Sequence, residues 1–345
     1  MLGLDLRALR AAWTVFLFAL LIGLVYRVRH TLIVFALAIF LAHLLAPLVE
    51  RLQRFVPRRM SRTLALAIVY LAFVGVALAI LIPLGGKIGE QAAALAGQLP
   101  ETLKSDPLSH IPLPSALEPW RPRISEILKE QAARLGQGAV PMLREIGPGI
   151  LSGIGTAVAV VLVPILSFFF LKDGPALRAA LLESVRAGRR SVVEETLNDL
   201  HVLVAQYIRA LVLLAMAAFA CYSAFLSLAQ VPYPVLLAGI AGVLEAIPVL
   251  GPAVGGIVML VVAALSGYQH VLWILIFLIV YRLFQDYVLS PYLLGSGIEL
   301  HPLLVLFGLL AGEQVAGIPG MFFSVPVIAA LRIIVVRFRR EHTRA

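Results

Sequence analysis

The chain is poor in charged residues, has a single cysteine and lacks the short motifs of several common enzyme classes. Charged residues occupy 14% of its 345 positions, against about 25% in a typical soluble domain. With Cys221 as the only cysteine, an intrachain disulfide framework and a cysteine-based metal cluster are excluded. No GxxxxGK[ST], HExxH or GxSxG run occurs, which argues against a P-loop ATPase, a zincin protease and a nucleophile-elbow hydrolase.

Metal ions, cofactors and nucleic acids are also not indicated. The seven histidines form no ligand-like pair along the sequence, so we expect no metal site and no cofactor. His43 lies in an apolar run. We interpret it as a histidine at an interface whose ring nitrogens have hydrogen-bond partners, and not as a metal ligand. The sequence pI is about 10.0, but the basic residues lie mostly in short loops beside apolar runs. No basic stripe with interleaved aromatic residues appears, so nucleic acid is not an expected partner.

Long apolar runs dominate what is present. Hydrophobic residues make up 61% of the chain, and its mean hydropathy is +0.98. Residues 210–244 and 246–281 contain no Lys, Arg, Asp or Glu. About 20 apolar residues cross a bilayer, so we expect an all-α, polytopic protein embedded in the lipid bilayer. About eight transmembrane helices are predicted, at 11–26, 31–49, 63–83, 150–171, 210–229, 234–265, 271–287 and within 303–331.

The loops predict the orientation. Eight spans place both termini on one side, together with the arginine-rich segment 50–62, residues 172–209 and the tail from Arg332. The positive-inside rule makes that side cytoplasmic. Arg27 and Arg29 fall on the other side as a minor exception. They also follow 11–26 at the place where a signal peptide would have the small residues of its cleavage site. We therefore interpret 11–26 as a membrane span that is not cleaved off.

Polar stretches divide the chain into helices 1–3 (1–83), an extracytoplasmic insert (84–149) and a C-terminal membrane domain (150–345). The insert has amphipathic stretches near 87–99 and 123–137. Two interpretations of it remain open, namely a solvated spacer resting on the membrane and a cap or subunit-contact element. Within the C-terminal domain, 175–205 repeats apolar residues among charges and predicts an amphipathic helix at the cytoplasmic interface.

One run, from Glu245 to Gly256, combines a carboxylate with helix-breaking residues. Pro248 and Pro252 remove backbone donors, and Gly251 permits close approach of another segment. Broken helices at membrane depth occur where they are buried in protein or line a wet cavity. The alternative is a proline kink for packing. Glu245 is interpreted either as a proton or cation site or as a structural carboxylate paired with Arg282 or a backbone group.

A second run holds Arg282, Gln285 and Asp286. Arg282 and Asp286 are four positions apart, so on a helix they share a face and can pair. If buried, the pair indicates a polar pathway or a fixed helix register. At an interface it would be an ordinary ion pair.

Two further runs lie near the end of the chain. A glycine-rich turn brings Glu299 and His301 to the start of the last apolar run, where helix capping with Pro302 in the first turn is the competing explanation. Glu313 lies in apolar sequence shortly before a second break, which contains Gly317 and Gly320. The sequence leaves open whether the sixth and eighth spans cross fully or dip and return.

In this order, these runs resemble the autoinducer-2 exporter (AI-2E) family of bacterial permeases. Leu166–Gly174 looks like its "FxLLKDG" segment, Glu245–Gly256 like its "IPxxGP" signature and Tyr287–Gly320 like its "P…G…LHPL…G…G" closing region. The resemblance covers nearly the whole chain. The residues that match these segments are Asp173, Gly174, Pro248, Gly251, Pro252, Pro291, His301, Pro302, Gly317 and Gly320. One departure is Gly312-Glu313, where the family often has Gly-Gly.

The resemblance implies an eight-span permease of the bacterial inner membrane, commonly a homo-oligomer. Some members are linked to export of the furanone quorum-sensing signal, and others are described as sodium (lithium)/proton antiporters. We therefore expect a non-enzymatic secondary transporter that exports a small polar solute. Coupling to a proton or monovalent cation would use Glu245, with Glu313 or Asp286 as further candidates. The alternatives are a cation/proton antiporter and, in another class, an oligomeric channel or envelope scaffold with the insert as its working part.

Overall fold

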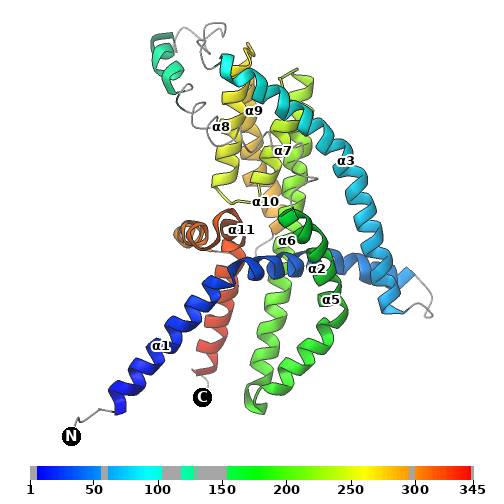
Figure 1. Cartoon of the computed structure of the whole chain (residues 1–345), viewed down its shortest axis with the longest axis vertical. Coiled ribbons are helices and arrows are strands. Elements are labelled where there is room, and N and C mark those ends of the chain that lie inside the picture. Colours follow the sequence, from blue (N-terminus) through cyan, green and yellow to red (C-terminus); the bar gives the residue numbers. More distant parts are fainter. Residues whose placement is uncertain are drawn as a thin grey trace.

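A computed structural model describes residues 6–55, 61–102, 118–127, 130, 154–294 and 300–342 of the chain, and all of its regular elements in these ranges are helical (Figure 1). The all-α, polytopic membrane class is thereby confirmed. Within the same ranges, five helices are long and apolar enough to cross a membrane, and three shorter apolar helices accompany them. The five are 29–55, 62–98, 187–228, 271–293 and 302–339, and the shorter ones are 12–27, 234–244 and 250–265.

The first two predicted spans form one bent helix. α1 (Leu6–Arg27) and α2 (Arg29–Phe55) are joined through Val28 alone. The backbone N–H of Val28 still donates to the carbonyl of Leu24, and that of Leu32 donates to the carbonyl of Val28, both at 3.0 Å. The expected loop between these spans is therefore absent. No glycine or proline stands between them, and arginine does not interrupt helical hydrogen bonding.

α2 packs against α3 (Arg62–Thr102) and α5 (Ile154–Ser184) in an N-terminal group of helices. Leu45 and Val49 of α2 are buried against Leu66 of α3. The Tyr70 hydroxyl lies 2.5 Å from Ser167 Oγ, which joins α3 to α5. Asp173 and Gly174 lie in α5 just beyond this contact, so the segment resembling "FxLLKDG" is continuous helix.

The insert begins as an extension of a membrane helix. α3 continues past residue 83, where the sequence predicted the span to end, and runs to Thr102. Its last turns pack on the start of α7 (Pro234–Leu244). Gln91 Oε1 accepts a hydrogen bond from the Leu236 N–H at 2.8 Å, and Gln98 Oε1 accepts one from the Tyr233 hydroxyl at 2.6 Å.

A second part of the insert covers the same end of the C-terminal domain. The 3-10 helix η1 (Glu118–Trp120) leads into a helix at 121–127. Ile124 packs on Ala264 at the end of α8 (Leu250–Leu265), and so does Val271, the first residue of α9 (Val271–Phe284). This contact attaches part of the predicted insert to the C-terminal domain. Most of the predicted helix at 123–137 lies outside the described residues.

The predicted interfacial helix at 175–205 is two helices. α5 ends at Ser184, the 3-10 helix η2 (Ala187–Arg189) makes the turn, and α6 (Arg190–Leu228) follows. The Ser184 hydroxyl donates to the Leu181 carbonyl at 2.7 Å, and Arg190 Nε donates to the Leu182 carbonyl at 3.0 Å. These bonds satisfy carbonyls of the last helical turn, so α5 can stop here. Both halves of the expected helix thus continue apolar helices.

The predicted sixth span is a helical hairpin, hereafter hairpin 1. It consists of α7, the break at 245–249 and α8 (Leu250–Leu265). At 1.5 Å per residue these helices are about 16 and 24 Å long, shorter than the roughly 30 Å of a bilayer core. The Tyr268 hydroxyl, beyond α8, donates to the Ala229 carbonyl, before α7, at 2.9 Å. The segment therefore enters and leaves at one end, as a re-entrant pair does.

The last predicted span contains a second hairpin, hereafter hairpin 2. α11 (Pro302–His342) changes direction at Ala316 and Gly317, whose φ angles are −146° and +62°. The helical arms before and after this turn lie in close contact. The contact leaves no room for a side chain, since a Cβ added to Gly320 would lie 1.8 Å from the Gly312 carbonyl oxygen. Gly308 similarly faces Ser324. Both breaks expected in the C-terminal half are therefore present, and both turn the chain back.

Candidate functional site

The break in hairpin 1 buries a carboxylate. Glu245 follows the last residue of α7 and is only 7% exposed. Pro248 and Pro252 lack N–H donors, so a regular helix cannot continue through this segment. Val249 takes a φ of +66° at the turn, and the Gly251 N–H donates to the Ile247 carbonyl at 2.9 Å. The local sequence thus places an acidic side chain where two short helices meet inside the domain.

Two polar side chains from the end of the next helix meet this carboxylate, and a third pairs with one of them. α9 (Val271–Phe284) carries Arg282, and the π-helix η3 (Gln285–Leu289) continues it. Gln285 Nε2 donates a short hydrogen bond to Glu245 Oε1, and Arg282 Nη1 lies 3.8 Å from the same oxygen. Arg282 Nε also donates to Asp286 Oδ2 at 2.8 Å. The structure therefore brings together four residues from two sequence runs, here named the Glu245 cluster.

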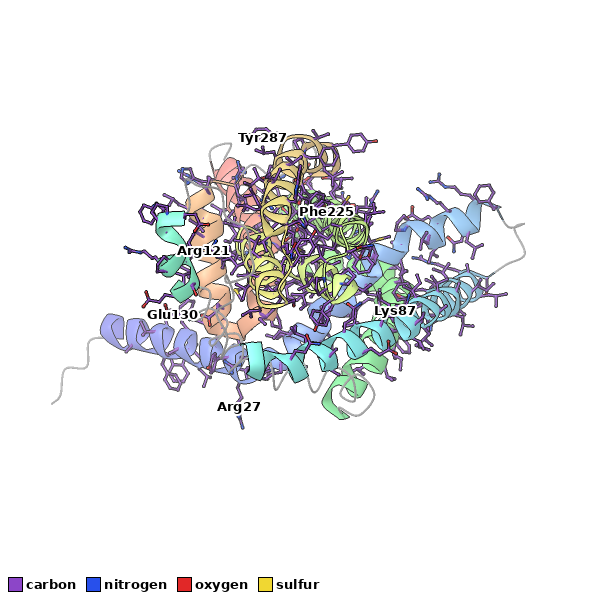
Figure 2. The ribbon with its side chains drawn as sticks, turned by 90° about the horizontal axis from the view of Figure 1, so that it is seen from above. Arg27, Lys87, Arg121, Glu130, Phe225 and Tyr287 are labelled. Atoms are coloured by element: carbon purple, nitrogen blue, oxygen red, sulfur yellow. The ribbon has the colours of Figure 1, made fainter. Side chains whose placement is uncertain are left out.

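The widened π-turn at η3 separates the two polar side chains that follow Arg282. Gln285 is 2% exposed and points toward Glu245, whereas the Asp286 side chain is 45% exposed. Single π-turns inside α-helices occur frequently at functional sites. Figure 2 shows Tyr287 directed away from the helices, at the outer side of the same turn. The cluster thus reaches from the buried break toward a partly exposed carboxylate.

Several buried polar atoms near the cluster have no hydrogen-bond partner among the described residues. They include Glu245 Oε2, Gln285 Oε1 and the Tyr281 hydroxyl. Leaving such a group unpaired costs about 1–3 kcal/mol. Tyr222 of α6 packs beside Tyr281, with ring centroids 4.8 Å apart, and both rings lie within electrostatic reach of Glu245 and Arg282. Within the described part of the chain, the cluster therefore leaves buried donor and acceptor atoms unpaired beside two aromatic rings.

The tyrosines were not identified from the sequence. Tyr222 and Tyr281 lie in apolar runs, where their rings counted toward the predicted spans. Only their hydroxyl groups, which are polar within apolar runs, could have marked these two residues as part of a polar site. The Tyr222 ring faces α9, where it meets Phe277 and Tyr281, and Figure 2 shows Phe225, one turn beyond Tyr222, among the same packed helices.

Hairpin 2 lies beside the break of hairpin 1. Ala246, next to Glu245, packs in a cluster with Tyr207 of α6 and with Val305 and Val325 from the two arms of hairpin 2. The tip of hairpin 2 contacts a different region, because Arg29 Nη1 donates to the Val315 carbonyl at 3.1 Å. The bond satisfies a carbonyl at the broken helix end. It also gives a contact to an arginine that the positive-inside rule left as an exception.

Glu313 is exposed near this tip and does not take part in the contacts described for the Glu245 cluster. The close approach of the two arms uses Gly312 and Gly320, so the acidic residue that departs from the family's Gly-Gly pair leaves this contact undisturbed. Gly317 supplies the positive φ of the turn. Glu313 is therefore placed at the second break, apart from the first carboxylate.

The remaining predicted residues lie at helix ends. His301 precedes α11 and accepts a hydrogen bond on Nδ1 from the Leu303 N–H at 3.3 Å, while Pro302 occupies the first helical position. The capping explanation therefore accounts for both. Pro291 lies in α10 (Ser290–Leu294), directly after the π-turn. Glu299 lies outside the described residues.

Comparison with known proteins places the chain in a family. A family model described as "AI-2E family transporter" matches residues 14–340, so the chain belongs to the AI-2E family. The Bacillus subtilis "Putative transport protein YrrI" is 24% identical over 323 residues, covering 89% of this chain and 86% of that protein. "Putative transport protein YueF" of the same species is 26% identical over 343 residues, covering 93% and 91%.

A shorter match comes from another organism. "Putative transport protein MJ1177" of Methanocaldococcus jannaschii is 28% identical over 180 residues, covering 50% of this chain and 53% of that protein. The resemblance seen in the sequence is confirmed. The family and the apolar helices define a multi-pass membrane protein with a role in membrane transport.

Proposed function

We propose that the protein is a non-enzymatic secondary transporter that exports a small polar solute, for which the furanone quorum-sensing signal is the first candidate. The observation that carries this proposal is the buried Glu245 cluster at the break of a re-entrant hairpin. A charged side chain within a membrane span is costly, so such groups mark solute or ion pathways. Paired half-helices at membrane depth present free helix ends to polar guests.

Coupling to an ion gradient follows from the charges. Glu245 and Asp286 contribute two negative charges and Arg282 one positive charge when all three are ionised, so the cluster carries one excess negative charge. That excess favours binding of a proton or monovalent cation. The Tyr281 hydroxyl, which has no hydrogen-bond partner among the described residues, can donate to an uncharged polar solute beside it. We infer that solute and ion share this region.

The experiment is a flux assay on protein reconstituted in liposomes. Wild-type protein is expected to move the furanone signal faster than empty liposomes do, and Glu245→Gln is expected to reduce this flux at least tenfold. Glu50→Gln is the matched control, because Glu50 is an exposed carboxylate near the end of α2. Wild-type flux equal to that of empty liposomes, or equal flux in both variants, would contradict the proposal.

A sodium (lithium)/proton antiporter is the second candidate, and the same net negative cluster favours it. Dequenching of an enclosed pH dye on addition of sodium or lithium, without furanone flux, would select it. A channel or envelope scaffold predicts neither coupling nor sensitivity to Glu245→Gln. Insertion in the bacterial inner membrane as a homo-oligomer, with both termini cytoplasmic, completes the proposal and rests on the family and on the positive-inside rule.

A further inference from the structure

Two histidines that are 158 positions apart in the sequence meet between α2 and α6. His43 Nε2 lies 3.1 Å from His201 Nδ1, and the ring centroids are 4.9 Å apart. This pair lies outside the Glu245 cluster, and no residue of that cluster is among its described hydrogen-bond partners. It was invisible in the sequence, where the histidines gave no ligand-like spacing.

The backbone fixes the protonation of one ring. His43 Nδ1 lies 2.8 Å from the Ile39 carbonyl oxygen, which can only accept a hydrogen bond. In the neutral ring Nδ1 of His43 therefore carries the proton, and the Nε2 lone pair accepts a hydrogen bond from His201 Nδ1–H. Histidines that bind metals are typically oriented in this way, with the second ring nitrogen donating to a carbonyl or carboxylate.

The separation of the two nitrogens suits a shared metal ion. With metal–nitrogen bonds of about 2.0–2.1 Å, two ligands lie about 2.9 Å apart at a right angle and about 3.4 Å apart at a tetrahedral angle. The observed 3.1 Å falls between these values. His201 can offer Nδ1 by carrying its single proton on Nε2 instead, which changes the tautomer without releasing a proton.

We propose that His43 and His201 form a binding site for a divalent transition-metal ion such as Zn²⁺, which bridges α2 and α6. The proposed site has these two histidines as its protein ligands, and among the described residues no group of three or more His, Cys, Asp or Glu side chains gathers around a metal position. His201 is exposed, and water completes the coordination. Imidazole suits zinc, copper and nickel, whereas Mg²⁺ and Ca²⁺ prefer oxygen ligands.

A bound ion would have a mechanical consequence. α2 belongs to the N-terminal group with α3 and α5, whereas α6 packs on hairpin 1 and on α11. A metal bridge would replace the hydrogen bond between the two rings by two metal–nitrogen bonds that join the groups. Any motion that slides α2 along α6 is then opposed by the ion. The site would act as a metal-dependent lock on that contact.

The test measures metal binding directly, on full-length protein without an affinity tag in detergent. Zn²⁺ is titrated in competition with a chromophoric chelator. The wild type is expected to bind one equivalent, and His43→Gln and His201→Gln are each expected to weaken binding at least tenfold. His30→Gln and His270→Gln are the controls, because both residues are exposed, and they should bind as the wild type does. The proposal is overturned if the wild type takes no Zn²⁺ from the chromophoric chelator, or if all variants bind Zn²⁺ equally well.

A spectroscopic measurement covers the case in which His43→Gln folds poorly. With Cu²⁺ as probe, electron paramagnetic resonance of the wild type should show coupling to two imidazole nitrogens. The exposed His201→Gln substitution should reduce this to one. A spectrum without imidazole coupling, or one that His201→Gln leaves unchanged, rejects the pair as the ligands.

Discussion

Hairpin 1 depends on a close contact that only glycine allows, and replacing Gly251 by alanine tests it. A Cβ at residue 251 would lie 1.7 Å from the Leu244 carbonyl oxygen and 2.6 Å from its carbonyl carbon. Both are backbone atoms and cannot turn aside, so α7 and α8 must separate. Overpacking of this kind costs typically 1–3 kcal/mol, and we expect about 3 kcal/mol here.

Gly256 provides the matched control on the same helix. A Cβ there would meet Leu278 Cδ1 at 3.5 Å, an ordinary contact with the end of a flexible side chain. Alanine is also favoured over glycine in a helix by about 1 kcal/mol. Because both glycines lie in α8, this gain cancels in the comparison, and Gly251→Ala should be about 3 kcal/mol less stable than Gly256→Ala. Because unfolding of such proteins is often irreversible, both melting curves are recorded at one scan rate.

The expected separation in Tm is on the order of 10 °C, from about 2–4 °C per kcal/mol. The same substitution displaces the break that carries Glu245, so transport in liposomes should fall with Gly251→Ala and persist with Gly256→Ala. Equal melting temperatures together with equal flux would refute the re-entrant geometry.

Three other substitutions probe the site and the second hairpin. Gln285→Leu removes the donor to Glu245 and should destabilise the protein by about 1.5–3 kcal/mol, measured by thermal unfolding. Arg29→Gln weakens the bond to the Val315 carbonyl, and we expect a loss of about 1 kcal/mol together with faster proteolysis at the tip of hairpin 2. Gly317→Ala forces an L-residue to a φ of +62°, which should cost about 1–3 kcal/mol in the same unfolding assay.

Two of these, Gly317→Ala and Arg29→Gln, have a control in the chain. Gly75→Ala adds a Cβ with nothing within 4 Å, so it should not lower the stability as Gly317→Ala does. Arg27→Gln changes an exposed arginine at the end of α1 and should leave the tip of hairpin 2 as it is. Losses of equal size in a substitution and its control would show that the named contacts do not account for the effect.

The positions of the two breaks could be predicted, but the direction in which the chain continues could not. Pro248 and Pro252 lack donors, and Gly317 and Gly320 tolerate unusual backbone angles, so the sequence indicates an interruption at each place. The missing donors are compatible both with a kinked crossing helix and with a hairpin. Tertiary contacts decide between them, such as the bond from Tyr268 to the Ala229 carbonyl.

Other differences have equally local causes. Arg27 and Arg29 look like loop residues between two apolar runs, yet arginine is a good helix former and the backbone continues through them. The pairing of Glu245 with Arg282 was among the predicted alternatives, since both are costly to bury alone. The contact of His43 with His201 requires α2 to lie against α6, which no spacing within either segment encodes.

Solvent access at the Glu245 cluster tests the central claim most directly, namely that a hydrated polar route passes through the kinked C-terminal half. In a Cys221→Ser background, Gln285→Cys and Ile274→Cys place thiols on one continuous helical segment, at sites that are 2% and 0% exposed. A membrane-impermeant thiol reagent needs water to reach them. We predict labelling of Gln285→Cys and none of Ile274→Cys. Equal labelling at both sites, or none at Gln285→Cys, would contradict the account.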